Sequence, residues 1–355
     1  MKEKRQRCLF LVALGLVLVL TAVMLLVKSC NQQNAGAETL YLPRAGRLIG
    51  ISLPEETDAW TRDGALLQKT LTALGYRVNL TYGDGTPQTQ NAQLADMITE
   101  GADCLVVAPT DSTALRVSGE AAKEKGIPLV SYDTLLMDTL GISGFVGFDY
   151  LEMGKAVGQY VVNRLQLDTA EKTPSLELLM GAPEDYNALL FHEGIVSVLA
   201  PYWDNGRLET PSRRLAFEDT CLSADSQELG AQVILSRFAK HYPDSPPDVI
   251  LCGSDTIAAG VLDALASRNY PGDTRPIVTG LGATSQGLQN LANDAQQVTV
   301  EPKRADLAKK CSGMIDYLLF GAQPAWTMGS VSNHAQEIPS APCAFQLIDI
   351  TNLPS

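Results

Sequence analysis

The sequence predicts an α/β protein with two doubly wound, Rossmann-like lobes behind an N-terminal membrane segment. Three observations lead to this fold class. Short apolar runs alternate with helical patterns of about ten to fifteen residues, which is typical of βαβ units around a parallel sheet. This rhythm restarts near residue 150, and a single sheet would not comfortably hold all the strands. A charge-free apolar run stands ahead of the first strand.

The first thirty residues predict export and attachment to a membrane. Residues 1–7 contain four basic side chains, and residues 8–27 contain no charged side chain. About twenty apolar residues cross the hydrocarbon core of a bilayer, and the basic flank favours a cytoplasmic N-terminus. The run "LVKSC" ends at Cys30 and resembles a bacterial lipobox, so lipidation at Cys30 and an uncleaved anchor over 8–27 both stay open. Either outcome places the remaining chain on the outer face of the cytoplasmic membrane.

The first lobe is expected to alternate strands with helices after a short linker. Brief apolar or alternating runs predict strands at 47–54, 76–83, 103–109 and 127–133. Apolar residues at helical spacing predict helices at 60–75, 89–101 and 113–126. Each of these helices ends on glycine, which is the residue that most often terminates a helix.

The second series repeats the same pattern from residue 150 onward. It predicts strands at 176–181, 213–219, 248–255, 276–282 and 295–301. It predicts helices at 150–167, 187–203, 226–242, 256–269, 285–294 and 304–321. Ligands of such sheets bind beyond the carboxyl ends of the strands, so the cleft between two facing lobes is the expected site.

Composition and charge exclude several functions. The net charge of −13 and the lack of a basic patch outside the N-terminus argue against nucleic acid as a partner. Three scattered histidines and the absence of a C-x-x-C motif argue against a metal site. No G-x-S-x-G nucleophile motif is present, and we predict no enzymatic activity. Five cysteines follow Cys30, so at least one thiol is unpaired, and the sequence does not show which of them pair.

The stretch "PIVTGLGATSQG", residues 276–287, looks at first like a nucleotide-binding turn. A dinucleotide fingerprint needs G-x-G-x-x-G between a strand and a helix. Gly280 and Gly282 fit this pattern, but Ser285 replaces the third glycine. We therefore predict no cofactor, and an oxidoreductase is a remote alternative.

Several stretches resemble the bacterial periplasmic sugar-binding proteins of ABC importers, especially the xylose-binding and multiple-sugar-binding group. The resemblance runs from about Arg47 to the C-terminus. The stretches that carry it are "AWTRDG", "GADCLVVAPTD", "GIPLVSYD", "FVGFDYLEMG", "GAPEDYNALLFHEGIVSVLAPYWDNGRL" and "SDTIAAGVLDAL". It implies a type I periplasmic-binding fold in which the chain crosses between the lobes three times, near Phe148, Pro276 and Glu301. The expected domains are then 1–45 as anchor and linker, 46–147 plus 276–300 as first lobe, and 148–275 plus 301–355 as second lobe.

The resemblance also implies a set of ligand-binding residues at the strand ends. These are Trp60, Tyr132, Asp133, Asp185, Asn187 and Asp255. Sugar hydroxyls both donate and accept, so carboxylates and amides in a closed cleft satisfy them, and an aromatic ring covers the apolar face of the sugar. The alternative is structural, because Asp and Asn at these positions also cap the following helices. Trp60 has the alternative of a packing role.

Other ligand-binding positions of the family carry different residues here. Ala59 and Thr134 stand where the family has arginines, Gly282 replaces an aspartate, and Pro302 replaces a lysine, with Lys303 shifted by one. Tyr150 replaces an asparagine. Each buried hydroxyl left without a partner costs about 1–3 kcal/mol. The sequence therefore predicts that xylose, glucose and arabinose bind weakly, and that a modified or deoxy sugar binds better.

Two uses of this fold follow from the resemblance. A tethered solute-binding protein delivers a sugar or sugar-like ligand to an ABC permease, which would then be its membrane partner. A sensor of the same fold passes its liganded state to a membrane kinase or chemoreceptor instead. The sequence does not identify the ligand or decide between transport and sensing.

Overall fold

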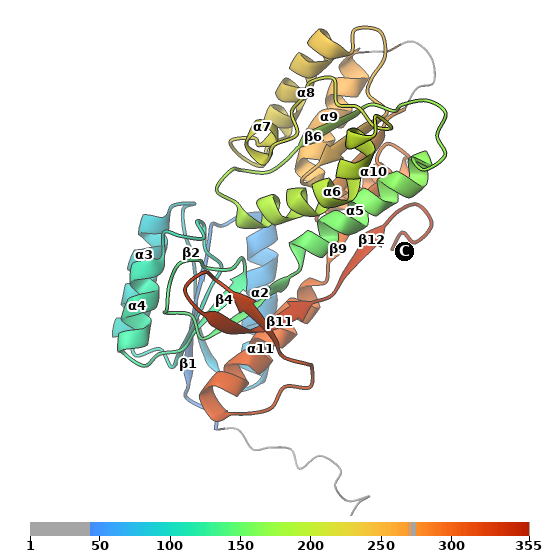
Figure 1. The fold of residues 1–355 in the computed structure, drawn as a ribbon. Coiled ribbons are helices and arrows are strands. Elements are labelled where there is room, and N and C mark those ends of the chain that lie inside the picture. Colours follow the sequence, from blue (N-terminus) through green and yellow to red (C-terminus); the bar gives the residue numbers. More distant parts are fainter. Residues whose placement is uncertain (1–42, 269, 271–274, 355) are drawn as a thin grey trace, which may run out of the picture. The chain divides into compact units, whose positions relative to one another are not determined.

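The structure is a computed structural model that describes residues 43–268, 270 and 275–354. The predicted anchor over 8–27 and the lipidation candidate Cys30 lie outside the described residues. The segment Arg44–Ser355 is one compact unit. It contains two sheets, one of seven and one of five strands, each with helices on both faces (Figure 1). No helix in the described ranges is long and apolar enough to cross a membrane.

The first sheet has the order β10-β11-β5-β4-β3-β1-β2. Its strands are β1 (Leu48–Leu53), β2 (Arg77–Tyr82), β3 (Cys104–Val107), β4 (Leu129–Asp133), β5 (Gly144–Phe148), β10 (Gly329–Ser332) and β11 (Glu337–Cys343). All neighbouring strands are parallel except the β10–β11 pair. Helices α2 (Asp58–Ala73) and α11 (Arg304–Phe320) cover one face. Helices α3 (Pro87–Thr99) and α4 (Arg116–Glu124) cover the other face.

The second sheet has the order β12-β9-β8-β7-β6. Its strands are β6 (Leu176–Leu179), β7 (Val249–Cys252), β8 (Ile277–Leu281), β9 (Val298–Pro302) and β12 (Phe345–Ile348). Only β12 is antiparallel to its neighbour. Helices α5 (Tyr150–Leu165) and α6 (Tyr186–Asp204) pack together on one side. Helices α8 (Gln227–His241), α9 (Asp255–Arg268) and α10 (Ser285–Ala292) lie on the other side, and α7 (Phe217–Thr220) is a single turn.

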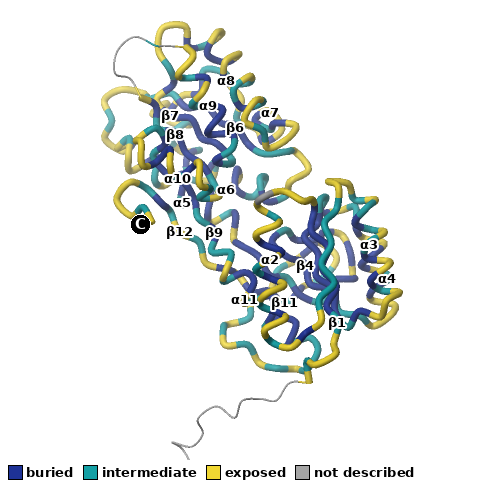
Figure 2. The backbone as a smooth tube through the Cα atoms, turned by 180° about the vertical axis from the view of Figure 1, so that it is seen from behind, coloured by how far each residue is buried: buried dark blue, intermediate teal, exposed yellow. Residues whose placement is uncertain are grey.

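The buried strands explain why the sequence pattern predicts this architecture. Strands β3, β4, β6 and β7 are buried at every residue, as expected for parallel strands with helices on both faces. Figure 2 shows the strands of both sheets as mostly buried and the outer sides of the helices as exposed. Caps define the helix starts: the Thr57 side chain accepts a hydrogen bond from the N–H of Trp60, and Thr86 does the same for Thr89.

The structure corrects the predicted division into lobes. Residues 276–300 were expected in the first lobe, yet β8 and β9 belong to the five-stranded sheet. Residues 301–355 were expected in the second lobe, yet α11, β10 and β11 pack with the seven-stranded sheet. The chain passes between the sheets after Phe148, after Pro302 and between Cys343 and Phe345. Three crossings are therefore present, but Pro276 is not one of them, because β8 pairs with β7 of its own sheet.

The structure also contradicts the predicted strand over 213–219. Two isolated bridges flank this segment, Ser175 with Glu209 before it and Met180 with Cys221 after it, and residues 213–219 themselves pair with no strand. Arg213 has a φ of 58°, which interrupts an extended run. The following residues form the turn α7, in which Phe217 is buried. The alternating pattern of this segment therefore reflects an irregular edge and not a paired strand.

Candidate functional site

Asp133 lies at the centre of the candidate site. It is the last residue of β4, has a φ of 65°, and is 4% exposed. Asp tolerates this left-handed conformation better than most residues do. Its carboxylate accepts hydrogen bonds from the hydroxyl of Tyr150 at 3.1 Å and from Nη1 of Arg304 at 2.8 Å. A predicted ligand residue is thus held by the first residues of α5 and α11, next to two crossings of the chain.

Arg304 is a site residue that the sequence reasoning missed. Its Nη1 also contacts Asp63 of α2 at 3.1 Å, and its guanidinium lies 5.3 Å from the centre of the Phe148 ring. Burial opposes the charge on Arg304, but Asp133, Tyr150 and Asp63 favour it, and its pKa lies well above its ordinary value. A cation at the first position of a helix is unfavourable unless acidic groups compensate its charge. The position of Arg304 at the start of a predicted helix was therefore a signal in the sequence that acidic side chains lie nearby.

Asp63 is the second acidic partner of Arg304. It is 6% exposed, and burial raises its pKa to about 6 despite the opposing effect of Arg304, with Asp133 raising it further. Trp60 precedes it by three residues, and residues at this spacing lie on the same side of a helix. Trp60 is half-buried and packs against the main core at the start of α2. Its packing role is therefore visible, and its role in ligand binding stays a prediction.

The N-terminus of α6 brings Asp185 and Asn187 to the same region. Asp185 caps the helix by accepting from the N–H of Asn187 at 2.9 Å. The side-chain amide of Asn187 donates to the hydroxyl of Thr134 at 2.8 Å, which is a direct hydrogen bond between the two lobes. Although Asp185 is exposed, the surrounding protein desolvates its carboxylate and raises its pKa to about 6, while N–H groups of Asn187 and Ala188 oppose this rise.

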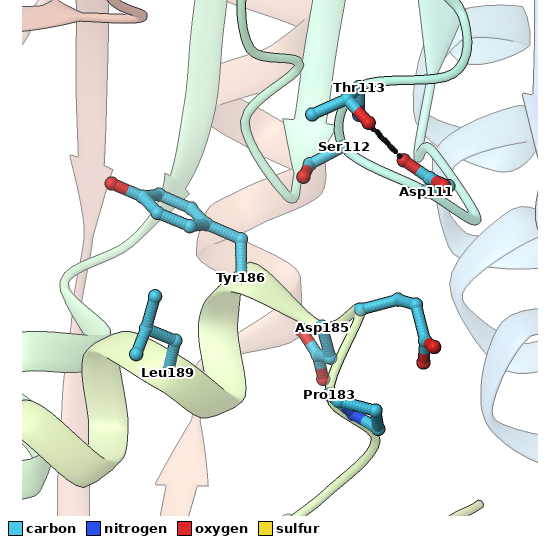
Figure 3. Close-up of a pocket in the computed structure, with 8 residues that line it drawn as sticks. Asp111, Ser112, Thr113, Pro183, Asp185, Tyr186 and Leu189 are labelled. Carbon is cyan, nitrogen blue, oxygen red and sulfur yellow. Dashed lines mark hydrogen bonds between the residues drawn. The ribbon is translucent and has the colours of Figure 1, made fainter. Parts of the chain in front are cut away.

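A pocket of about 250 Å³ lies beside these residues. Residues 111–113 of the first lobe form one wall, and residues 183–186 with Leu189 of the second lobe form the other (Figure 3). Figure 3 shows Asp185, Tyr186 and Leu189 on the side of α6, and Asp111, Ser112 and Thr113 on the opposite side. Three of the eight lining residues are acidic, and none is basic. The pocket is therefore an opening between the lobes in which acidic side chains stand beside apolar ones.

Tyr132 is the most deeply enclosed of the predicted residues. Its side chain is fully buried in the core on the α2 and α11 side of the first sheet, and its hydroxyl has no hydrogen-bond partner among the described residues. Burial raises its pKa well above the ordinary value, and the charges of Asp63 and Asp133 add to this effect. Its hydroxyl thus lies in the field of the acidic groups around Arg304.

Asp255 makes its hydrogen bonds within the second lobe. Its carboxylate is 1% exposed in the interior of the second lobe. It accepts from the N–H of Thr284 at 2.8 Å, from Nε2 of Gln296 at 2.9 Å and from the hydroxyl of Thr299 at 2.7 Å. These contacts tie the carboxylate to its own lobe. They are not the helix cap expected as the alternative, because the hydroxyl of Ser254 accepts from the N–H of Ile257 at the start of α9. A role of Asp255 in ligand binding stays a prediction.

The same carboxylate explains the glycine-rich stretch 276–287. A Cβ atom on Gly280 would lie 2.2 Å from Oδ1 of Asp255, and one on Gly287 would lie 2.2 Å from Oδ2. Gly282 has a φ of 124°, which side chains rarely adopt. The glycines therefore make room for a buried carboxylate and a tight turn. This is why the sequence resembles a phosphate-binding loop without its third glycine.

Metal and thiol chemistry find no support in the described ranges. There, no three His, Cys, Asp or Glu side chains are grouped to hold a metal ion. The cysteines Cys104, Cys221, Cys252, Cys311 and Cys343 are all unpaired. Burial raises the pKa of each of these thiols, so they behave as small apolar core residues.

Fold and site together define a two-lobed binding protein whose polar residues converge at the junction of the lobes. The chain belongs to the periplasmic binding protein domain family, whose model matches residues 49–323. The multiple sugar-binding periplasmic receptor ChvE of Rhizobium radiobacter is 30% identical over 86% of this chain and 87% of its own length. The multiple sugar-binding periplasmic protein SbpA of Azospirillum brasilense is 29% identical over 82% and 83%.

A solved structure is similar over nearly its whole length. It is an ABC transporter solute-binding protein from Clostridium phytofermentans with bound β-D-glucose. It is 32% identical, has a TM-score of 0.81, and the match covers 86% of this chain and 95% of that chain. The resemblance predicted from the sequence is thereby confirmed at the level of family and fold.

Proposed function

We propose that this protein captures a sugar or sugar-like molecule between its two lobes and delivers it to the permease of an ABC importer. The observation that carries this proposal is the convergence of polar groups from both lobes at one place. Asp133 and Thr134 come from the first lobe, and Asp185 and Asn187 from the second, with Arg304 at the crossing between them. Both similar periplasmic proteins are named for binding multiple sugars, and the similar crystal structure holds glucose.

The mechanism is closure of the lobes around the ligand. A ligand that contacts both lobes stabilises the closed form, because it binds that form better than the open one. The three crossings let the lobes move while their sheets stay intact. The hydrogen bond between Thr134 and Asn187 adds to the closed arrangement, and a permease would distinguish the closed from the open form.

The N-terminal segment supplies the location in this proposal. Residues 8–27 direct export, and lipid at Cys30 or the uncleaved segment holds the binding unit at the outer face of the cytoplasmic membrane. Replacing Cys30 by Ala tests the choice. If lipid is attached, Cys30→Ala keeps its full N-terminal segment and changes mobility on a gel and sensitivity to globomycin. Identical behaviour of the two proteins would leave the uncleaved anchor as the explanation.

A ligand screen on the Arg44–Ser355 unit tests the function. Thermal shifts are measured against sugars, polyols, nucleosides and acyl sugars, with reduced nicotinamide nucleotides as the probe for an oxidoreductase. We expect a neutral sugar or sugar derivative to raise the melting temperature and to reduce the radius of gyration in small-angle scattering. A tightly bound sugar that leaves the radius unchanged would contradict capture by closure. A response to the nucleotides alone would contradict solute binding.

A further inference from the structure

Arg304 and its two acidic partners form a charged group with unused hydrogen-bonding capacity. Both hydrogen bonds that Arg304 makes within the described residues leave from Nη1, one to Asp63 and one to Asp133. A guanidinium has five N–H donors in a planar fork, so the groups on Nε and Nη2 are free to bind something else. The three side chains together carry a net charge of −1 when both carboxylates are ionised.

Burial shows which member of this group a ligand would meet. The side chain of Arg304 is 37% exposed, while those of Asp63 and Asp133 are 8% and 5% exposed. One contact of the guanidinium, with the ring of the buried Phe148, also helps to hold it in place. Arg304 is thus the most accessible member of an otherwise enclosed cluster.

A second, independent feature indicates that this cluster takes a polar ligand. The hydroxyl of Tyr132 is buried without a hydrogen-bond partner, and Asp63, Asp133 and Arg304 all act on it electrostatically. A buried hydroxyl without a partner is rare in folded proteins and calls for an explanation. A bound hydroxyl group or a water held by it would provide the missing partner.

We infer that Arg304 supplies the cation that the ligand site has lost at positions 59, 134 and 302, and that with Asp133 it selects neutral hydroxyl groups over acidic ones. This inference rests on the proposed function. A ligand hydroxyl accepts a hydrogen bond from a free N–H of Arg304 and donates one to the carboxylate of Asp133. The free donor of Arg304 and a free lone pair of Asp133 are then both used. Such bonds to charged groups are stronger than those between neutral groups.

Charge is the reason for the selectivity. A carboxylate on the ligand would be the third acidic group around one guanidinium. After burial, the charge of Asp133 is one of the groups that raise the pKa of Asp185. Like charges at short range in a partly buried site are unfavourable. An ammonium group on the ligand would meet Arg304 as a neighbouring like charge but would also meet the acidic groups around it. The sequence predicted that glucose binds weakly because the family's cations are missing. Arg304 replaces one of these cations, so glucose becomes a candidate ligand.

Three probes with the same ring test the inference on the Arg44–Ser355 unit by titration calorimetry: D-glucose, D-glucosamine and D-glucuronate. We expect the unchanged protein to bind glucose and to bind glucuronate at least a hundredfold more weakly. Arg304→Gln should weaken glucose binding about ten- to a hundredfold, which is the loss expected for a hydrogen bond to a charged group. Arg304→Gln should weaken glucosamine binding by a factor at least ten times smaller than the factor for glucose, because the cation that repels the ammonium group is gone.

Three further variants separate recognition from folding. Lys303→Gln removes the same charge one residue away, where Lys303 pairs with Glu301, and should leave all three affinities within about twofold. Arg304→Lys keeps the charge but not the fork, so discrimination against glucuronate should persist while glucose binding falls. Asp63→Asn with Arg304→Gln removes one charge of each sign, and this double variant should show the same ligand selectivity as Arg304→Gln even where the single variant is unstable.

The outcomes distinguish this inference from the proposed function. Equal weakening of the three probes by Arg304→Gln, or no weakening, overturns the inference and shows a structural role for Arg304. A protein that binds none of the three probes also overturns it, and the wider ligand screen then decides the proposed function separately. A shift in preference from glucose toward glucosamine in Arg304→Gln, absent in Lys303→Gln, supports the assignment.

Discussion

The buried carboxylate of Asp255 gives the sharpest test of the structure. Asp255→Ala removes the acceptor of three hydrogen bonds, those from Thr284, Gln296 and Thr299. Gln296 keeps a second bond to the carbonyl of Val298, so two donors lose their main partner. At roughly 1–3 kcal/mol for each stranded buried group, the free energy of unfolding should fall by about 2–6 kcal/mol.

A second substitution, at Gly287, tests whether the loss of stability arises from the contacts of the Asp255 carboxylate. The three atoms that a Cβ on Gly287 would approach most closely all belong to the Asp255 side chain, at 2.2, 2.4 and 2.8 Å. Gly287→Ala should therefore cost about 1–3 kcal/mol through overpacking in the unchanged protein. In the Asp255→Ala background the space is free, and the same substitution should be neutral or stabilising, since Ala favours a helix over Gly.

The assay is a double-mutant cycle measured by urea unfolding of the Arg44–Ser355 unit. The coupling between the two substitutions should favour the double variant by about 1–3 kcal/mol, the range found for residues in contact. Asp255→Asn is the matched control. Oε1 of Gln296 is buried without a partner, so after rotation of its amide group Gln296 could accept a hydrogen bond from the Asn side chain. The free energy of unfolding should therefore fall less than in Asp255→Ala. An Asp255→Ala protein with unchanged stability and at least tenfold weaker ligand binding would refute the structural role.

The other predictions concern the site itself. Asp133→Ala should weaken ligand binding at least tenfold, while Arg304 keeps Asp63 as a partner. Titration calorimetry with a ligand from the screen measures this loss. An unchanged affinity would show that Asp133 has only a structural role. The pKa of Asp63 is raised to about 6 in the folded state, from an unfolded value near 4, so the folded state binds this proton more tightly. The free energy of unfolding should therefore fall as the pH rises from about 4 to 6. Asp63→Asn should flatten this pH dependence in urea unfolding, and an unchanged slope would show that another group titrates. Thr134→Val and Asn187→Ala each remove the hydrogen bond between the lobes, so both should enlarge the ligand-free radius in small-angle scattering; a change in only one would show that the bond is not the cause.

The pairing of distant residues lay beyond the reach of sequence reasoning. Arg304 is 171 residues from Asp133 and 241 from Asp63, and nothing local in the chain shows that these three side chains meet. The assignment of 276–300 to the first lobe was wrong for a related reason. Both sheets are built from similar βαβ units, and only the pairing of β8 with β7 decides which sheet receives it.

The sequence by itself determined the two-lobed class, the long helices and most of the central strands with their ends, but it missed β5, β10, β11 and β12 and predicted a strand over 213–219 that is absent. Periodicity and helix caps are local, so β4 and the start of α6 lie where the pattern predicts, and Asp133, Asp185 and Asn187 follow from them. The tertiary structure alone decided which polar groups share a site. Asp133 and Asp255 both stand at the ends of parallel strands, yet one joins an arginine at the lobe junction and the other is enclosed by donors of its own lobe. That difference depends on which helix and strand pack against each carboxylate, and packing is a property of the folded chain.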